Sequence, residues 1–343
     1  MSLKSYMVRK VKAIDKEKLN KLAREIAERN NKSVGFVKRD MIKNFIRYGI
    51  GYTDYLKGDY INLTKEQKKT YVTTKSFYRL LAYLNNPKYD ATMSDKIVFN
   101  KIFNKYLGRE WIDLRNSTVE DFKKFIKNKD VIFAKPPTDF GGHGIRKINT
   151  KDIKNINELY KELLDKKINL IEEAIIQHKE LDKLNPYAVN SFRIVTLVKD
   201  GKAHILANAL RINVDDAIAI GCSDAYMRLD ESGKICSRVI DDVANVYEEH
   251  PIAKIKFSTV RIPFVKECFD MALKAALEVP EMRYVGWDIA ITPKGPVIME
   301  GNEYPSYGLV QYYLFNDEHE GHLAQISKIL GDEMKKIKLW EIN

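Results

Sequence analysis

The segment 284–304 constrains the fold more than any other part of this 343-residue sequence. Two apolar runs flank the turn Pro293-Lys294-Gly295, a pattern that is typical of a β-hairpin. If a three-residue turn is centred on Lys294, Asp288 lies directly opposite Glu300 and both side chains project from one face. A β-bulge would shift this pairing by one residue. The sequence therefore predicts two carboxylates that face each other across paired strands.

Two carboxylates in these positions repel each other, and a cation between them would relieve the repulsion. Asn302, two residues beyond Glu300, adds an amide oxygen to the same face if the strand stays extended. Two carboxylates and one amide, with room for phosphate oxygens and water, suit Mg²⁺. The same sequence is also expected if the two acids merely lie at the exposed ends of two strands, but the strongly apolar neighbours favour burial of both side chains. We therefore predict that Asp288, Glu300 and Asn302 hold a metal ion.

Strand-like runs alternate with helical patterns beyond Thr118, which predicts an α+β fold. The turn Lys199-Asp200-Gly201-Lys202 joins two β-branched runs, so much of the sheet should be antiparallel. Two further helices, at about 263–279 and 318–337, are expected to cover one face of the sheet together. The other predicted strands are Val131 to Ala134, Arg146 to Ile148, Leu170 to Ile171, Phe192 to Val198 and Ala203 to Arg211.

The first hundred residues differ, because their apolar residues recur mostly at helical spacing. Leu19, Leu22 and Ile26 mark the first predicted helix, which begins at about Asp15. The turn-rich stretch 85–90 is the predicted boundary of a mainly helical N-terminal region that spans 1–90. Further helices are predicted at about 33–48, 65–85 and 95–107, the last capped by Ser94 or Asp95.

The chain is strongly basic, with 58 Lys and Arg against 47 Asp and Glu, and the excess is conspicuous in the first seventy residues. Nucleic acid, an anionic membrane surface and a phosphorylated substrate all fit such a charge. The early lysines also fall between helical apolar positions, which is typical of a plain solvated face. We therefore do not expect nucleic acid as a partner on this basis.

Cysteine usage and hydropathy bear on the compartment. The three cysteines, Cys222, Cys236 and Cys268, are odd in number and lack the close spacing of metal sites, so neither a disulfide framework nor a zinc site is predicted. Residues 1–13 build no apolar core of a signal peptide, and no apolar run approaches membrane-spanning length. We expect a cytoplasmic protein with no membrane span.

Lys135 ends one predicted strand and precedes two prolines and the loop 139–144, whose last four residues are Gly141, Gly142, His143 and Gly144. A glycine-rich turn can direct backbone N–H groups towards a phosphate, and a lysine beside it supplies a point charge. The same letters fit a flexible hairpin tip, and the spacing matches neither the Walker nor the Rossmann pattern. His143 either contacts phosphate or is merely exposed.

Two other sets of residues are candidates for ligand contact. The stretch Glu172-Glu173-Ala174-Ile175 ends a strand and could bond adenine through its backbone and Glu172, although an exposed acidic helix start explains it equally well. Arg193 and Arg211 lie within otherwise apolar strands, where an unpaired guanidinium would be costly to bury. They need anions, which are either core carboxylates in structural ion pairs or the phosphates and anionic substrate of an active site.

In their order along the chain, these motifs resemble the ATP-grasp superfamily, and most closely its sugar-transfer-associated branch, which has relatives among glutamate ligases that modify proteins and cell-wall polymers. The resemblance covers about 91–315. Family members carry an Asp-Lys helix start, a strand that ends in lysine, a glycine-rich loop, a glutamate-rich hinge and an acidic hairpin that ends in Glu-x-Asn. The matching residues here are Asp95-Lys96, Lys135, Gly141 to Gly144, Glu172-Glu173, Gly286-Trp287-Asp288 and Glu300-Gly301-Asn302.

The resemblance implies an ATP-grasp fold at about 91–340, in which two α+β subdomains sandwich ATP, with the lid at about 126–180 and the metal-binding subdomain at about 190–340. The family's usual ribose-binding acid is replaced by Asn190 or Ser191. Arg211 resembles the arginine that approaches the reacting phosphate, and Arg193 is a second catalytic candidate. The residues implied to bind ATP are Lys96, Lys135, Gly141, Gly142, His143, Gly144, Glu172, Glu173, Ile175 and Asn190, with Mg²⁺ or Mn²⁺ on Asp288, Glu300 and Asn302.

The implied activity is that of a carboxylate–amine ligase, in which ATP converts a carboxylate to an acyl phosphate and an amine then displaces phosphate. The branch implies small-molecule substrates, a sugar acid or an amino acid together with an amine, in polysaccharide or cell-surface assembly. One alternative keeps the fold but transfers the phosphoryl group to a hydroxyl. Another, from a different class, is a non-catalytic module whose basic N-terminal helices bind nucleic acid or another anion.

Overall fold

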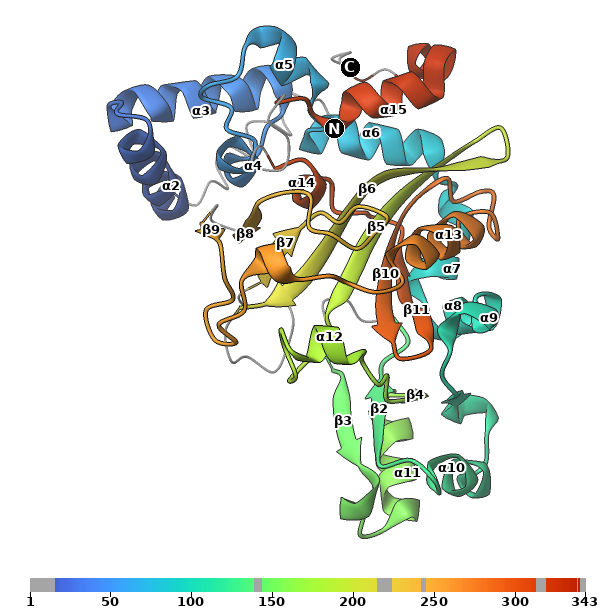
Figure 1. The fold of residues 1–343 in the computed structure, drawn as a ribbon. Coiled ribbons are helices and arrows are strands. Elements are labelled where there is room, and N and C mark those ends of the chain that lie inside the picture. Colours follow the sequence, from blue (N-terminus) through green and yellow to red (C-terminus); the bar gives the residue numbers. More distant parts are fainter. Residues whose placement is uncertain are drawn as a thin grey trace.

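The computed structural model describes residues 16–138, 144–214, 224–241, 245–312, 319–337 and 339. Three bodies follow one another down the molecule: the N-terminal helices, a large sheet with helices on both faces, and a smaller sheet backed by helices (Figure 1). This is the α+β architecture with a helical N-terminal region that the sequence predicted. The loop residues Gly141, Gly142 and His143, like Asp15 and Cys222, lie outside the described residues.

The large sheet is antiparallel along its described strands, in the order β11-β10-β5-β6-β7-β8-β9. The prediction of a mainly antiparallel sheet is therefore confirmed. Asp200 and Gly201, which join β5 to β6, both adopt positive φ, as a tight hairpin turn requires. The strands are β5 (Ser191–Lys199), β6 (Lys202–Asn213), β7 (Asp224–Met227), β8 (Val239–Asp241), β9 (Val246–Tyr247), β10 (Tyr284–Thr292) and β11 (Gly295–Asn302).

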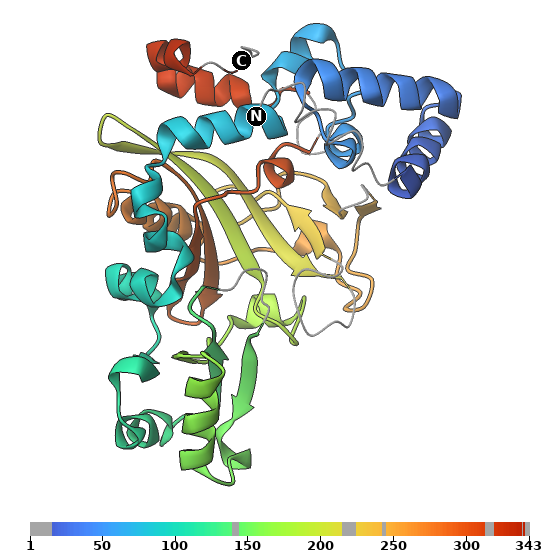
Figure 2. The ribbon, with the colours of Figure 1, turned by 180° about the vertical axis from the view of Figure 1, so that it is seen from behind.

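Helices cover both faces of the large sheet (Figure 2). Helix α13 (Val265–Ala275) packs in the cluster that contains Ile194 of β5. Helices α6 (Thr74–Leu84) and α15 (His322–Leu330) pack in the cluster that contains the next residue, Val195. Since successive side chains of a strand point to opposite faces, α13 and α15 lie on opposite faces. The prediction that these two late helices share one face is wrong, because β5 is buried on both sides and needs a layer on each.

The N-terminal helices have an apolar core of their own, in which Leu19, Leu22 and Ile26 are buried as predicted. The predicted helix 65–85 is two helices, because the chain extends between them and Thr73 caps the second. The region is bonded to the C-terminal part of the chain, since the backbone of Val72 exchanges hydrogen bonds of 3.0 and 2.6 Å with the Gln311 side chain. The first helices are α2 (Lys16–Arg29), α3 (Val34–Tyr48), α4 (Tyr52–Lys57) and α5 (Lys65–Thr70).

The small sheet, in the order β1-β4-β2-β3, is also antiparallel along its described strands. Ile132 and Ala134 of β2 point inward and pack with Phe122 and Leu163 of the two backing helices. The sheet begins before the predicted lid start at 126, while the predicted subdomain boundaries stay predictions. Its elements are β1 (Trp111–Asp113), α10 (Val119–Ile126), β2 (Val131–Lys135), β3 (Arg146–Asn149), α11 (Ile156–Asp165) and β4 (Leu170–Glu173).

Several short helices complete the described chain. Among the described residues, no helix is both long and apolar enough to cross a membrane. Asn85, in the turn-rich stretch after α6, exchanges hydrogen bonds of 2.8 and 2.9 Å with the backbone of Tyr284 at the start of β10. The predicted domain boundary is thus a turn that is bonded to the large sheet. The remaining helices are α7 (Ala91–Ser94), α8 (Lys96–Ile102), α9 (Asn104–Leu107), α12 (Lys179–Asp182) and α14 (Tyr307–Val310).

Candidate active site

A pocket lies where the start of α8, the ends of β2 and β4, and the strand β11 meet. It therefore lies between residues of the small sheet and residues of the large sheet. Its lining contains five of the residues predicted for the site, which are Lys96, Lys135, Glu172, Glu300 and Asn302. The fold thus brings together side chains as far apart in the sequence as Lys96 and Asn302, which are 206 positions apart.

Lys96 is positioned by the cap of α8. The Asp95 carboxylate accepts hydrogen bonds from the backbone of Ile97 and Val98 at 2.9 and 3.1 Å, which fixes the helix start as the sequence predicted. The backbone N–H of Lys96 donates to the carbonyl of Pro137 at 2.8 Å. Because Pro137 follows Lys135 closely in the chain, this bond keeps the two predicted phosphate lysines at the same pocket.

Glu172 is the centre of a buried ion-pair network. Its carboxylate lies 2.5 Å from Lys135 Nζ and 2.7 Å from the Arg109 guanidinium, and it accepts a 2.9 Å hydrogen bond from Asn100. Burial opposes ionisation of Glu172, but the charges of Lys135 and Arg109 outweigh it and lower its pKa to about 2. Both carboxylate oxygens are engaged, so contact of this side chain with adenine stays a prediction and would require it to give up a donor.

The hairpin of β10 and β11 pairs Asp288 with Glu300, as predicted. The route to this pairing differs, because Thr292 pairs with Gly295 and the connecting loop has two residues instead of three. A bulge at Met299, between the pairs that Asp288 and Ile289 make, adds one residue to β11 and restores the predicted register. The turn and the bulge thus compensate each other.

Gly301, between Glu300 and Asn302, lets β11 approach the helix α8 closely. A Cβ atom at this position would lie 2.8 Å from both the Met93 sulfur and the Phe99 ring, closer than real contacts allow. A larger residue between the two predicted metal ligands would therefore require the Met93 and Phe99 side chains to move.

Asp288 and Glu300 are neighbours with opposite pKa shifts. Both oxygens of Asp288 accept hydrogen bonds from the Arg193 guanidinium, at 2.6 and 2.8 Å. Burial opposes ionisation of Asp288, but the charge of Arg193 lowers its pKa. Burial and the charge of Asp288 raise the pKa of Glu300 to about 7. The Asn302 amide lies 3.4 Å from the Asp288 carboxylate, so the predicted metal ligands are side by side.

Arg211 extends this row of charges across the same face of the large sheet. It lies two residues from Ala209, the β6 partner of Arg193, and alternate residues of a strand share a face. Its Nη2 atom lies 2.6 Å from the Asp224 carboxylate. Its Nε atom is buried and has no hydrogen-bond partner within the part of the chain that the structure describes. Both predicted catalytic arginines therefore make ion pairs, and Arg211 keeps one donor to spare.

The remaining predicted residues lie outside the lining of this pocket. Glu173 accepts a 3.1 Å hydrogen bond from the backbone of Glu110, and Ile175 is half-buried after β4. Asn190 is buried, and its amide donates to Gln177 at 3.0 Å, while its Oδ1 atom has no hydrogen-bond partner among the described residues. Gly144 adopts positive φ at the edge of the part of the loop that is not described.

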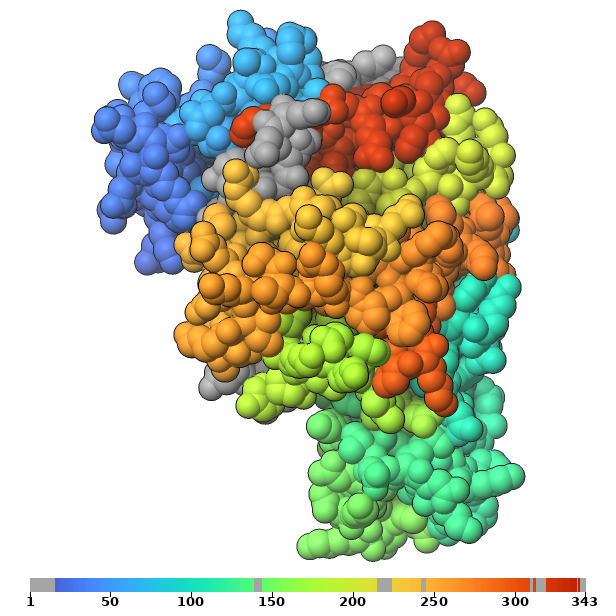
Figure 3. All heavy atoms as spheres, viewed as in Figure 1, coloured from blue at the N-terminus to red at the C-terminus, as the bar shows by residue number. Residues whose placement is uncertain are grey.

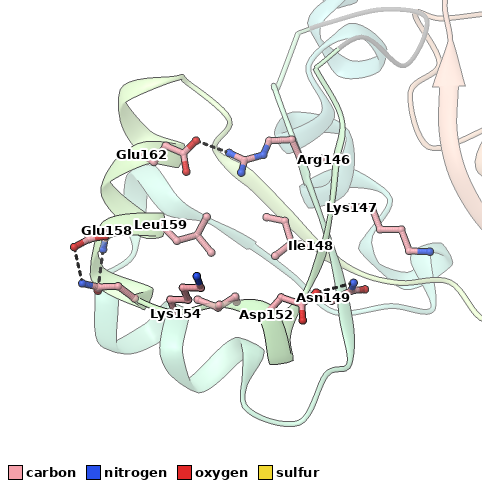
Figure 4. A pocket seen from close by; sticks show the side chains of 11 residues that line it. Arg146, Lys147, Ile148, Asn149, Asp152, Lys154, Glu158, Leu159 and Glu162 are labelled. Carbon is pink, nitrogen blue, oxygen red and sulfur yellow. Dashed lines mark hydrogen bonds and ion pairs between the residues drawn. The ribbon is translucent and has the colours of Figure 1, made fainter.

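A separate hollow lies on the small sheet between β3 and α11 (Figure 4). It contains none of the predicted site residues. Arg146 there pairs with Glu162 at 3.0 Å, and the neighbouring Asn149 bonds Asp152 at 3.0 Å. Four of the polar side chains that line this hollow are thus paired with each other.

Three residues of the site were not predicted from the sequence: Arg109, Asn100 and Asp224. Arg109 bonds Glu172 of the small sheet and also donates to the carbonyls of Ile298 and Met299 at the bulge, at 2.8 and 3.2 Å. It therefore fastens the two walls of the pocket together. The only signal in the sequence was a cation directly after Gly108, which adopts positive φ and turns the chain.

Several solved structures resemble this chain in fold. They include D-alanine–D-alanine ligase from Bacillus anthracis (15% identity, 79% of this chain and 78% of that chain, TM-score 0.43). D-alanyl-alanine synthetase A from Vibrio cholerae O1 biovar eltor matches at 13% identity over 70% of this chain and 65% of that chain, with a TM-score of 0.42. The ATP-grasp ligase PsnB, complexed with its minimal precursor, matches at 16% identity, TM-score 0.38, over 64% of this chain and 55% of its own length.

The chain thus covers less than two thirds of the length of the last two structures. Among curated protein sequences, none matches this chain significantly. A family model does match, over residues 78–319, and its description is sugar-transfer associated ATP-grasp. This span is more than half of the chain and contains every residue predicted for the site. The chain therefore belongs to the sugar-transfer-associated ATP-grasp family and has the ATP-grasp fold, preceded by a mainly helical N-terminal region.

Proposed function

We propose that this protein is an ATP- and Mg²⁺-dependent ligase that phosphorylates a substrate carboxylate and joins the resulting acyl phosphate to an amine. The observation that carries the proposal is the composition of one pocket, which Lys96 and Lys135 line together with Glu300 and Asn302. Lysines suit the phosphate oxygens of ATP, and the facing carboxylate and amide suit the divalent cation that binds with those phosphates. Membership of the ATP-grasp family supports the same assignment.

The predicted ligands fit a magnesium ion. Burial and the adjacent charge of Asp288 raise the pKa of Glu300, and a bound cation would favour the ionised carboxylate instead. The described residues contain no group of three or more His, Cys, Asp or Glu that could enclose a metal. Because Asp288, Glu300 and Asn302 are only three ligands, they would leave positions for phosphate and water, as nucleotide-bound Mg²⁺ requires, and Mn²⁺ would fit the same ligands. When bound, the metal would neutralise charge on the transferred phosphoryl group.

The lysines and arginines of the chain would hold the ATP phosphates. Lys135 pairs with Glu172 but stays partly exposed, so phosphate oxygens would compete for it while Arg109 keeps Glu172 neutralised. Arg193 would keep Asp288 in place, and the spare Nε donor of Arg211 would approach the reacting phosphate. Charge placed around the terminal phosphates favours attack at the γ-phosphorus, which gives ADP and an acyl phosphate.

The adenosine would lie on the far side of the phosphates, where Glu172, Glu173 and Ile175 leave β4. The buried Oδ1 atom of Asn190, which has no partner within the described chain, would accept a hydrogen bond from a ribose hydroxyl. The loop that carries Gly141, Gly142, His143 and Gly144 would cover the phosphates and exclude water, which protects an acyl phosphate from hydrolysis.

The substrates in this proposal are a sugar acid or amino acid and an amine, in the cytoplasmic assembly of a polysaccharide or another cell-surface polymer. The family description, which associates it with sugar transfer, supports this choice. In the same way, an ATP-consuming reaction on small molecules agrees with the expected cytoplasmic location.

The proposal is tested by identifying the products that the protein forms from ATP and from the substrate acid. The protein is incubated with Mg-ATP and pooled uronic acids, amino acids and amines, and hydroxylamine is added to trap the activated acid as a hydroxamate. We expect ADP, a carboxylate-dependent hydroxamate and, without hydroxylamine, an amide. A stable phosphoester without hydroxamate would make the protein a phosphotransferase, and AMP with pyrophosphate would reject both mechanisms.

A matched pair of lysines on α8 links the activity to the pocket. Lys96 lines the pocket, whereas Lys101 on the same helix is exposed to solvent. Lys96→Met should abolish ADP formation, and Lys101→Met should leave it unchanged. Equal activities in the two variants would place the nucleotide elsewhere.

A further inference from the structure

Nearly all of the net positive charge of the chain lies in its N-terminal seventy residues. They contain 18 Lys and Arg against 8 Asp and Glu, a net charge of +10, while the whole chain carries +11. The remaining 273 residues, which include every residue of the ATP pocket, are therefore almost neutral, with 40 basic and 39 acidic side chains. The excess positive charge thus belongs to the first seventy residues and not to the candidate nucleotide site.

Helix α3 presents apolar side chains on two of its faces. One face is buried and packs Val37 and Met41 into the N-terminal core. On the other face Phe36, Ile42 and Ile46 are 45%, 38% and 55% exposed. In the described part of the chain, no other helix exposes more than one large apolar side chain. Large apolar side chains repeated along one solvent-exposed helix face indicate a surface that binds a partner protein or a membrane.

Basic side chains alternate with these apolar ones. Arg39, Lys43 and Arg47 are exposed at helical spacing between them, and Lys32 Nζ lies 5.7 Å from the centre of the Phe36 ring. The single acid of the helix, Asp40, is turned inward, where it accepts hydrogen bonds from Asn44 and from the Tyr55 hydroxyl. The exposed face of α3 is therefore both apolar and free of acidic side chains.

We propose that this α3 face, which consists of Phe36, Arg39, Ile42, Lys43, Ile46 and Arg47, docks on the surface of a membrane that contains anionic phospholipids. The cations would contact the lipid phosphates, and the apolar side chains would enter the boundary between headgroups and acyl chains. Nucleic acid would use the same cations but offers no apolar layer for two isoleucines. The lipid surface therefore accounts for both parts of the pattern.

The position of α3 suits such docking. The helix lies at the opposite end of the molecule from the small sheet, in a lobe that projects from the large sheet (Figures 1 and 3). A membrane against this lobe would leave the pocket between the two sheets open to solvent. Small-molecule substrates would therefore reach the ATP site while the protein is bound to the surface.

The test uses the full-length protein with phosphatidylcholine vesicles, with and without phosphatidylserine, in a sedimentation assay at low and high salt. We expect binding only to the anionic vesicles and release by salt. Arg39→Glu with Lys43→Glu should weaken binding at least roughly thirtyfold, since each cation near such a surface contributes about fivefold. Phe36→Ser with Ile46→Ser keeps every charge but should also weaken binding, by roughly tenfold or more.

The matched control is Lys124→Glu with Lys127→Glu, in and directly after helix α10 behind the small sheet, which changes the net charge equally at the far end of the molecule. This variant should bind as the unaltered protein does. No binding to anionic vesicles, or an equal loss in the control, would overturn the proposal. So would an unchanged affinity after loss of Phe36 and Ile46. Tighter binding to an oligonucleotide, or a dimer that these same substitutions disrupt, would assign the α3 face to nucleic acid or to a second copy of the chain.

Discussion

The two walls of the candidate ATP pocket each present a carboxylate, and the pKa values of the two acids are shifted in opposite directions. On the small-sheet wall, Glu172 lies against Lys135 and Arg109, and its pKa falls to about 2. On the large-sheet wall, burial and the adjacent Asp288 raise the pKa of Glu300 to about 7. Both acids line the same pocket.

The difference follows from the charges within reach and not from burial alone. Two cations pair directly with the carboxylate of Glu172, whereas at the hairpin Arg193 bonds Asp288, and the charges of Arg193 and Lys96 only partly offset the burial of Glu300 and its repulsion by Asp288. A carboxylate whose charge is matched by nearby cations stabilises the fold. A carboxylate with too few nearby cations is suited to bind a metal cation. The comparison therefore separates a carboxylate that is neutralised within the fold from one that we propose as a metal ligand, and substitution of each acid should have a different effect.

Glu172→Gln should give the largest effect, which is on stability. The substitution leaves Arg109 buried without its counter-charge, and breaking a buried ion pair in this way costs about 3 to 5 kcal/mol of the free energy of unfolding. Urea unfolding measures the loss. Glu173→Gln, at the next position, is the control and should cost less than about 1 kcal/mol, because its partner is a backbone N–H that an amide oxygen also accepts. Equal costs for the two variants would contradict the buried network.

Glu300→Gln should have the reverse effect, with activity lost and the fold kept. Removal of a metal ligand should lower Mg²⁺-dependent turnover on the order of a hundredfold. The melting temperature should stay the same or rise, because the repulsion with Asp288 disappears. Steady-state ADP formation and thermal unfolding are measured on one preparation. A variant that melts early but binds Mg-ATP normally would make the acid pair structural.

The smallest expected effect is on how the free energy of unfolding changes with pH. Glu300 and Glu172 should contribute to this change with opposite signs. The pKa of Glu300 rises from 4.5 to about 7 on folding, so its contribution is complete below pH 4.5 and is lost as the pH rises through about 7. The pKa of Glu172 falls from 4.5 to about 2, so its contribution is complete above pH 4.5 and is lost as the pH falls through about 2.

Between pH 4.5 and about 7, the free energy of unfolding should therefore fall with rising pH, by up to about 1.4 kcal/mol per pH unit. Urea unfolding across this range measures the slope, which should flatten in Glu300→Gln. Saturating Mg²⁺ should raise stability more near neutral pH, where Glu300 is ionised, than at acid pH. A slope that persists in Glu300→Gln would assign the titration to another group.

The sequence predicted the parts of the site that depend on neighbouring residues. The pairing of Asp288 with Glu300 follows from one hairpin, and the place of Lys96 follows from the cap that Asp95 makes. The Arg109 contacts could not be predicted in this way, because Glu172 and Ile298 lie 63 and 189 positions away. The opposite placement of α13 and α15 is also a property of the assembled sheet, since each helix has an apolar face that suits either side.

The bonds between the N-terminal region and the end of the chain set the order in which the protein can be completed during synthesis. Val72 bonds Gln311, 239 positions later, and Asn85 bonds Tyr284. On the ribosome, α6 therefore emerges before all of its packing partners, of which β5 and β6 come first and β10 and α15 much later. An incomplete chain would therefore expose part of the apolar surface of α6. Exposed apolar surface favours aggregation, so nascent chains of this protein are prone to aggregate until α15 packs on the sheet.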